Sequence, residues 1–175
     1  MERKRYVIIM AAGSGTRMGA GRPKQFLELD GKAILQKTIE VFLEACPGIS
    51  VITVLPKDFI EYWRTYCLER NFVCPQILVA GGITRFHSVR NALDRVPEGA
   101  LVGVHDGVRP FVSRKVLDEC FSRAWVDGAA IPMIDLQDSL RHIVGSDATE
   151  VVPRDRYRLV QTPQVFKLSL LLRPY

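Results

Sequence analysis

The sequence predicts a three-layer α/β domain in which helices cover both faces of a doubly wound, mostly parallel sheet. Short runs rich in β-branched residues alternate with longer segments whose apolar residues recur at helical spacing. Such alternation favours parallel strand pairing through right-handed crossovers. Of the 175 residues, 47% are hydrophobic and 25% are charged, which is ordinary for a globular protein, so we expect a single domain over 1–175.

The expected elements follow one another along the chain. Strands are expected at 6–12, 49–56, 76–82, 100–106 and 129–134, and helices at 31–46, 57–71, 84–96 and 113–128. The last of these helices has clear ends, because Ser113 suits an N-cap and Gly128 suits a stop.

The alternation breaks after Asp135. Two alternating runs flank the turn sequence "GSDA", which predicts a protruding β-hairpin arm over about 136–158, followed by a short strand. The final segment, "KLSLLLRPY", begins like a helix and stops before two turns are complete. We therefore expect that this sequence is a truncated form and that the natural protein continues past Tyr175.

Charge and cysteine content favour an ordinary basic protein surface and reduced thiols. The net charge is +5, but the Lys and Arg residues are scattered, so no nucleic-acid partner is expected. The four cysteines form no C-x-x-C pair and lack histidines at zinc-finger spacing. The apolar run near the N-terminus is too short for a signal peptide or a membrane span, so we expect a cytoplasmic protein with no membrane partner.

Three loops should meet at the carboxyl ends of the strands, where sheets of this kind bind ligands. Their sequences are "AAGSGTRMG", "AGGITRFHS" and "HDGVRP". The first is no dinucleotide fingerprint, because Met18 stands where a third glycine is needed, and no P-loop, because Gln25 follows Lys24. What remains is a glycine-rich turn whose N–H groups, with Arg17 and Lys24, would hold a phosphate chain; a plain strand-to-helix turn is the alternative.

Six motifs extend the pattern over nearly the whole chain: "AAGSGTRMG", "PKQFLELDGKAIL", "GGITRFHSV", "VHDGVRPF", "DSLR" and "YRLVQTPQVF". In this order they resemble the 2-C-methyl-D-erythritol 4-phosphate cytidylyltransferase family of the sugar-phosphate nucleotidyltransferase superfamily. The resemblance implies a Rossmann-like nucleotidyltransferase fold and the transfer of CMP from CTP to methylerythritol phosphate, with release of pyrophosphate. It also implies Mg²⁺ and a homodimer formed through the hairpin arm.

The resemblance assigns roles to individual residues. Arg17 and Lys24 would stabilise the transition state, and Arg154 on the arm would act in the partner's site. Nucleotide contacts are expected from Ala11, Ala12, Gly13, Gly15, Gly82 and Ser88, and acceptor contacts from Arg109, Ser139 and Thr162.

Two of the expected site residues also have ordinary structural interpretations. Asp106 ends the fourth predicted strand, the place for a carboxylate that holds Mg²⁺, but it also suits a turn cap before Gly107. The resemblance favours the metal. Ser88 suits either a base contact or the first turn of a helix. His105 is expected to be packed or hydrogen-bonded rather than a ligand, because Mg²⁺ prefers oxygen.

Alternative functions remain. A ribitol 5-phosphate cytidylyltransferase would share the fold and most motifs, and a non-catalytic nucleotide-binding regulator could use the same sheet. The regulator is disfavoured because a pure binder has no need of both Arg17 and Lys24. A nicotinamide oxidoreductase is disfavoured by the failed fingerprint. Ile83 stands where many members of the family carry an acidic residue, so selectivity for a pyrimidine would depend on fewer groups.

Overall fold

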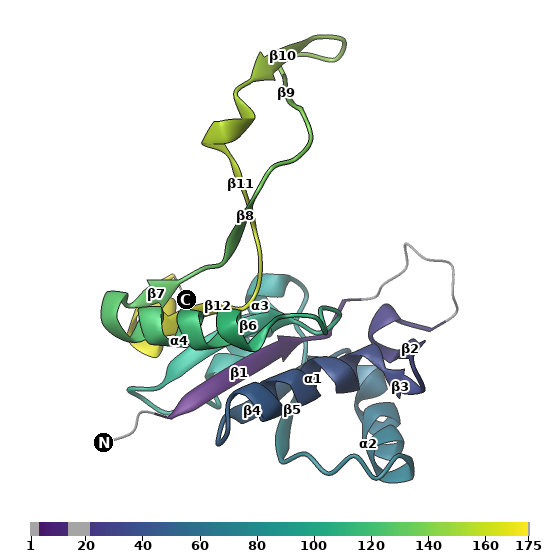
Figure 1. The fold of residues 1–175 in the computed structure, drawn as a ribbon. Helices are drawn as coiled ribbons and strands as arrows, with labels where there is room; N and C mark the ends of the chain where they lie inside the picture. The colour runs from purple at the N-terminus through teal and green to yellow at the C-terminus, as the bar shows by residue number, and fades with distance from the viewer. Residues whose placement is uncertain (1–3, 14–21, 175) are drawn as a thin grey trace.

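The computed structural model describes residues 4–13 and 22–174. Within these residues, the central sheet has six strands in the order β5-β4-β1-β6-β12-β7 (Figure 1). The parallel strands are β1 (Arg5–Met10), β4 (Ser50–Leu55), β5 (Gln76–Ala80) and β6 (Leu101–Asp106). The predicted doubly wound, mostly parallel sheet is therefore confirmed.

Helices cover both faces of this sheet. One face carries α1 (Ile34–Ala45), α2 (Ile60–Glu69) and α4 (Arg114–Asp127), and the other carries α3 (Arg85–Leu93) and α5 (Leu168–Leu171). Side chains alternate along β1, so Val7 and Ile9 pack under the first group while Ile8 packs under the second. The result is two apolar cores on either side of one sheet.

The ends of α4 follow the sequence. The Ser113 hydroxyl accepts a hydrogen bond from the Val116 N–H at 3.3 Å, and Gly128 ends the helix with φ 93°. All four cysteines are free thiols, two of them buried, and burial raises the pKa of Cys67 to about 11. None of the helices in the described ranges has the length and apolar character needed to cross a membrane.

The sheet becomes antiparallel at one side. β12 (Gln164–Lys167) runs antiparallel to both β6 and β7 (Ala129–Ala130). The prediction of a single strand at 129–134 is wrong. The chain leaves the sheet at Pro132, because proline has no N–H to donate to a ladder. The remainder forms β8 (Met133–Asp135), which pairs elsewhere.

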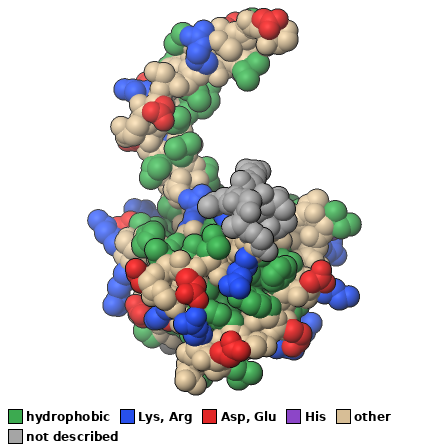
Figure 2. Space-filling model, turned by 90° about the vertical axis from the view of Figure 1, so that its right-hand side faces the viewer, with side chains coloured by type: hydrophobic (Ala, Val, Ile, Leu, Met, Phe, Trp, Pro, Cys, Tyr) green, Lys and Arg blue, Asp and Glu red, His purple; other side chains and the backbone are tan. Residues whose placement is uncertain are grey.

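A long arm projects from the body, and the predicted hairpin forms its tip (Figure 1). β8 pairs with β11 (Arg158–Val160) near the body, and β9 (Leu140–Ile143) pairs with β10 (Thr149–Val152) further out. The short helix η4 (Arg154–Arg156) lies between β10 and β11. Hydrophobic side chains lie on the outside of the arm (Figure 2), and Ile143 and Val151 are 73% and 78% exposed.

Three short features before α1 and α2 were not predicted. β2 (Glu28–Leu29) and β3 (Lys32–Ala33) form a hairpin whose turn residues Asp30 and Gly31 both have positive φ, as Asp-Gly turns prefer. The predicted helix at 57–71 begins as a 3-10 turn, η3 (Lys57–Phe59). A second such turn, η2 (Lys24–Phe26), packs its Phe26 ring against the rings of Phe59 and Tyr62.

Candidate functional site

A cavity of about 540 Å³ opens at the carboxyl ends of β1 and β6, where the strand order reverses. β4 and β5 lie on one side of β1 and β6 lies on the other, so connections diverge here and leave a crevice. All three predicted loops contribute. The lining residues are Met10, Ala12, Gly13, Gly82, Ile83, Thr84, Arg85, Ser88, Asp106 and Val108.

The first loop enters the cavity directly from β1. The Ala11 N–H donates to the Val54 carbonyl at 2.9 Å, and Ala12 and Gly13 follow as lining residues. The buried side chain of Gln25 donates from Nε2 to the carbonyls of Ala11 (2.7 Å) and Gly13 (3.2 Å). No spacing in the sequence marked Gln25 as important. Gly15 and Arg17 lie outside the described residues.

The second loop is held by Ser88. Its hydroxyl accepts from the Gly82 N–H at 3.0 Å and donates to the Thr84 carbonyl at 2.9 Å. Ser88 therefore lies in the first turn of α3, as one interpretation predicted, and also at the wall of the cavity. A Cβ at Gly82 would lie 2.5 Å from the Cβ of His87, so only glycine fits. Thr84 caps α3, whose N-terminal end lies at the cavity and favours anions.

The third loop presents Asp106 between two arginines. Its Oδ1 lies 3.0 Å from Nη1 of Arg85, and its Oδ2 lies 3.0 Å from Nε of Arg109. The Gly107 N–H donates to the Met10 carbonyl at 2.9 Å, which fixes the end of β6 beside the end of β1. Arg85 was not predicted as a site residue; its position as the first residue of α3 was the available signal.

Asp106 suits a hard divalent cation. Within the described ranges no group of three or more His, Cys, Asp or Glu side chains gathers around a point. A single carboxylate at the wall of this cavity fits Mg²⁺, which usually takes one or two protein carboxylates and completes its shell with water and substrate phosphates. The side chain of Asp106 is 26% exposed, and both of its oxygens face arginine side chains at the edge of the cavity.

His105 is packed, as expected from the sequence. Its ring is fully buried, lies edge-on to Phe42 with centroids 4.8 Å apart, and bonds through Nε2 to the Arg109 carbonyl at 3.0 Å. Burial lowers the pKa of His105 to about 4, so the ring is neutral at physiological pH. The imidazole therefore helps to shape the third loop and adds no charge to it.

A second cavity, of about 590 Å³, adjoins the first at Val108. Two of the predicted acceptor residues, Arg109 and Thr162, line it. The Thr162 hydroxyl accepts from the Asp106 N–H at 3.4 Å, and Arg109 donates from Nη1 to Gln161. The side chain of Arg109 therefore connects Asp106 to the second cavity.

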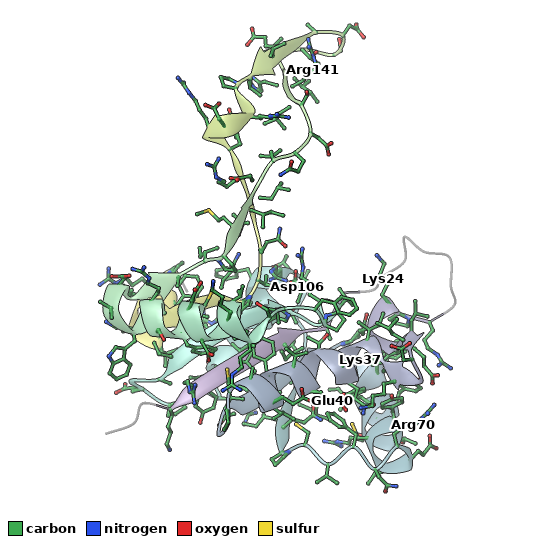
Figure 3. All side chains as sticks on the ribbon, in the orientation of Figure 1. Lys24, Lys37, Glu40, Arg70, Asp106 and Arg141 are labelled. Atoms are coloured by element: carbon green, nitrogen blue, oxygen red, sulfur yellow. The ribbon has the colours of Figure 1, made fainter. Side chains whose placement is uncertain are left out.

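The remaining predicted residues lie further out. Lys24 belongs to η2 and is half-buried. Lys24 and Asp106 lie on the same side of the body (Figure 3). Ser139 and Arg154 belong to the arm, where Arg154 donates from Nη1 to the Gln137 carbonyl at 2.6 Å. The arm projects away from the body, so the structure does not bring these two residues to the cavity of their own chain (Figure 1).

Comparison with known proteins gives one consistent family. The model of the 2-C-methyl-D-erythritol 4-phosphate cytidylyltransferase family matches residues 6–175. Proteins of that name from Phocaeicola vulgatus and Porphyromonas gingivalis are each 47% identical to this chain, covering 98% and 100% of it and 78% of their own length.

Solved structures agree. The chain superposes on the 2-C-methyl-D-erythritol 4-phosphate cytidylyltransferase of Thermus thermophilus with a TM-score of 0.73 at 33% identity, covering 97% of this chain and 73% of that one. The 4-diphosphocytidyl-2C-methyl-D-erythritol synthase of Anaerococcus prevotii gives a TM-score of 0.81 at 26% identity, with the same coverage. The fold and the chain's family are thus found by independent comparisons.

Proposed function

The chain belongs to the 2-C-methyl-D-erythritol 4-phosphate cytidylyltransferase family, and on this premise we propose which parts of the structure perform its reaction. It is a nucleotidyltransferase that moves CMP from CTP onto methylerythritol phosphate in isoprenoid precursor synthesis. The first cavity would bind CTP, and the second would receive the acceptor. The observation that carries this assignment is the convergence of Ala12, Gly13, Gly82, Ser88 and Asp106 around one cavity.

The chemistry needs cations more than it needs a protein nucleophile. A phosphate oxygen of the acceptor attacks the α-phosphorus of CTP, the bond to the β-phosphate oxygen breaks, and pyrophosphate leaves. The protein has to bring two polyanions together and stabilise charge on the five-coordinate phosphorus. Lys24 and Arg17 are proposed for this task. Within the described residues the carbonyl of Lys24 accepts from the Leu27 N–H, but its side-chain ammonium has no hydrogen-bond or ion-pair partner and is available to a ligand there.

The nucleoside part of CTP would lie against small residues. Ala11, Ala12, Gly13, Gly15 and Gly82 would let the backbone approach the base, with Ser88 holding the second loop in place. The side chain of Ile83 is 97% exposed at the same wall and would offer an apolar surface rather than a hydrogen bond.

Asp106 is proposed as the residue that holds Mg²⁺. When bound, the ion would neutralise charge on the triphosphate and orient it. Arg85 and Arg109 already bracket the carboxylate, so cationic groups surround the place where phosphate oxygens would collect. Arg109 and Thr162 would then contact the acceptor phosphate from the second cavity.

A homodimer formed through the arm is proposed to complete the site with Ser139 and Arg154 of the partner subunit. The arm carries exposed apolar side chains, and Ile143 and Val151 lie on one face of the β9–β10 ladder. Exposed large apolar side chains that share one face are typical of an interface. The chain as a whole is proposed to act as one nucleotidyltransferase domain with this arm, in the cytoplasm.

Release of pyrophosphate tests the assignment. The protein is incubated with Mg²⁺, one of the four nucleoside triphosphates, and methylerythritol phosphate or ribitol 5-phosphate. We expect turnover with CTP and methylerythritol phosphate, at a rate at least tenfold above any other pair, because each missing polar contact in a binding site costs about 1 to 3 kcal/mol. Turnover with ribitol 5-phosphate alone would overturn the acceptor, and binding of CTP without turnover would favour the nucleotide-binding regulator.

A further inference from the structure

We infer that Gln25 is a positioning residue for the nucleotide, because its side-chain amide sets the direction of the backbone groups in the first loop. Gln25 is 3% exposed and is not among the residues that line the CTP cavity. Its effect therefore passes through the residues that it holds. The inference rests on the proposed binding of CTP in that cavity.

The amide of Gln25 holds both ends of a short backbone segment. Nε2 lies 2.7 Å from the Ala11 carbonyl oxygen and 3.2 Å from the Gly13 carbonyl oxygen, so both of its N–H groups have an acceptor. The Ala11 N–H is fixed independently by the Val54 carbonyl of β4. Residues 11–13 are thus held from the sheet on one side and from η2 on the other.

This arrangement fixes the donors as well as the acceptors. In a trans peptide the C=O and the following N–H point to opposite sides. Holding the Ala11 carbonyl toward Gln25 therefore turns the N–H of Ala12, a lining residue, away from Gln25. A backbone N–H in a loop can bind a ligand oxygen only while its peptide plane is held in one orientation.

The support behind Gln25 is rigid. Phe26, the next residue, is 1% exposed, and its ring lies 5.3 Å from that of Phe59 and 5.0 Å from that of Tyr62, measured between centroids. The Phe26 N–H donates to the Pro23 carbonyl at 3.0 Å. The aromatic cluster therefore anchors the 3-10 turn from which the Gln25 amide reaches the loop.

Gln25 also follows Lys24 directly in the chain. One side chain thus joins the segment that carries a proposed catalytic cation to the segment that lines the nucleotide cavity. Glutamine suits this position because it offers two donors on one neutral atom. Glutamate has the same shape but only acceptors, and methionine has the same length but no strong donor.

The test measures the affinity for CTP with Mg²⁺ and no acceptor, by calorimetry, in the Gln25→Met and Gln25→Glu variants of the full chain. We expect the Kd for CTP to rise at least about tenfold in both, because two buried carbonyls lose their donors and the loop reorients. The KM for methylerythritol phosphate should change less than about threefold. An unchanged Kd in a folded Gln25→Met variant would overturn the inference.

Gln36→Met is the matched control. Gln36 is also a buried glutamine, 5% exposed, but its side chain bonds to Glu40 and Tyr66 rather than to the loop. We expect this variant to lose thermal stability and to keep its Kd for CTP within about twofold. If Gln25→Met and Gln25→Glu fail to fold, Gln25→Asn retains the donors but withdraws them by one methylene, and an unchanged Kd there would equally overturn the inference.

Ala12→Leu distinguishes failure of the Gln25 inference from failure of the proposed CTP cavity, because the leucine side chain would enter that cavity. Loss of CTP binding in Ala12→Leu, together with unchanged binding in Gln25→Met, would overturn the role of Gln25 and support the proposed CTP cavity. Unchanged CTP binding in both variants would show that CTP does not bind in this cavity.

Discussion

Nη1 of Arg85 lies 3.0 Å from Oδ1 of Asp106, an ion pair that joins the start of α3 to the end of β6 at the wall of the proposed CTP cavity. The side chain of Arg85 is 54% exposed, so the pair contributes little to stability. Its position is more informative. A guanidinium that balances the carboxylate in the free protein becomes available for phosphate oxygens once a cation occupies Asp106.

Arg85→Ala should therefore weaken CTP binding. We expect the Kd for CTP in the presence of Mg²⁺ to rise about tenfold or more, because charge-assisted hydrogen bonds contribute about 1.5 to 3 kcal/mol. Calorimetry measures this directly. Arg95→Ala is the control, since Arg95 lies beyond the far end of α3, a helix whose first and last residues are about 12 Å apart along the axis. Equal affinities in the two variants would contradict this role for Arg85.

Removal of the metal should stop turnover, and loss of the carboxylate proposed to hold it should slow turnover. We expect chelation with EDTA to abolish pyrophosphate release and added Mg²⁺ to restore it. Asp106→Asn should raise the Mg²⁺ concentration for half-maximal rate and lower kcat about a hundredfold, because the neutral amide is a weaker ligand for a hard cation. Titration of the rate with Mg²⁺ measures both effects. Full activity in EDTA would exclude the proposed metal role.

Lys24→Ala should lower kcat more than it weakens CTP binding. We expect a loss of about a hundredfold or more in kcat, because a positioned cation is most valuable when charge develops in the transition state. Arg17→Ala should behave in the same way. Rapid-quench kinetics and CTP calorimetry separate the two effects.

Lys37→Ala provides the control for the Lys24 experiment. Lys37 lies on α1 (Figure 3), where its Nζ pairs with Asp30 at 2.9 Å. We expect kcat to stay within about twofold of the parent, because exposed pairs of this kind contribute little. If Lys24→Ala matches Lys37→Ala in rate, Lys24 has no part in the chemistry.

Complementation tests whether the arm acts in the partner's site. Lys24→Ala and Arg154→Ala should each be nearly inactive alone. After mixing and subunit exchange, half of the dimers would be mixed, and each of these would contain one intact site, so about a quarter of parental activity should return. Pyrophosphate release measures the recovery.

Disruption of the arm supplies the control for complementation. The Ile143→Asp/Val151→Asp double variant replaces the two exposed apolar side chains on one face of the β9–β10 ladder by carboxylates and should sediment as a monomer. Recovery of activity should be lost when both partners carry this change. If the mixed variants that still form dimers regain no activity, Arg154 acts within its own chain and the proposed role of the arm is wrong.

Tyr66→Phe should lower stability without changing catalysis. The Tyr66 hydroxyl accepts from the Ala33 N–H at 2.7 Å and donates to Oε1 of Gln36 at 2.8 Å, both in the buried core. Loss of the hydroxyl leaves a buried N–H without a partner, so we expect about 1 to 3 kcal/mol less free energy of unfolding. Urea denaturation measures the change, and Tyr62→Phe in the same helix should cost less. A free energy of unfolding equal to that of the parent would contradict a stabilising role for the Tyr66 hydroxyl.

The sequence was sufficient for the elements that depend on local pattern. Alternating β-branched runs and helical spacing located β1, β4, β5, β6 and the helices between them, because side-chain periodicity reports directly which face is buried. The hairpin of β2 and β3 was missed although Asp30 and Gly31 carry the Asp-Gly turn signal. The strand at 129–134 was misjudged, because pairing partners decide where a short apolar run leaves a sheet.

The sequence by itself determined the fold class, the three loops at the carboxyl ends of the strands, and the residues Gly82, Ser88 and Asp106 that line the cavity. Only the tertiary structure decided that Arg85 pairs with Asp106 and that Gln25 holds the carbonyls of Ala11 and Gly13. The physical reason is range. Periodicity and turn chemistry act over a few neighbouring residues, whereas a contact between distant positions exists only once the whole backbone path is fixed.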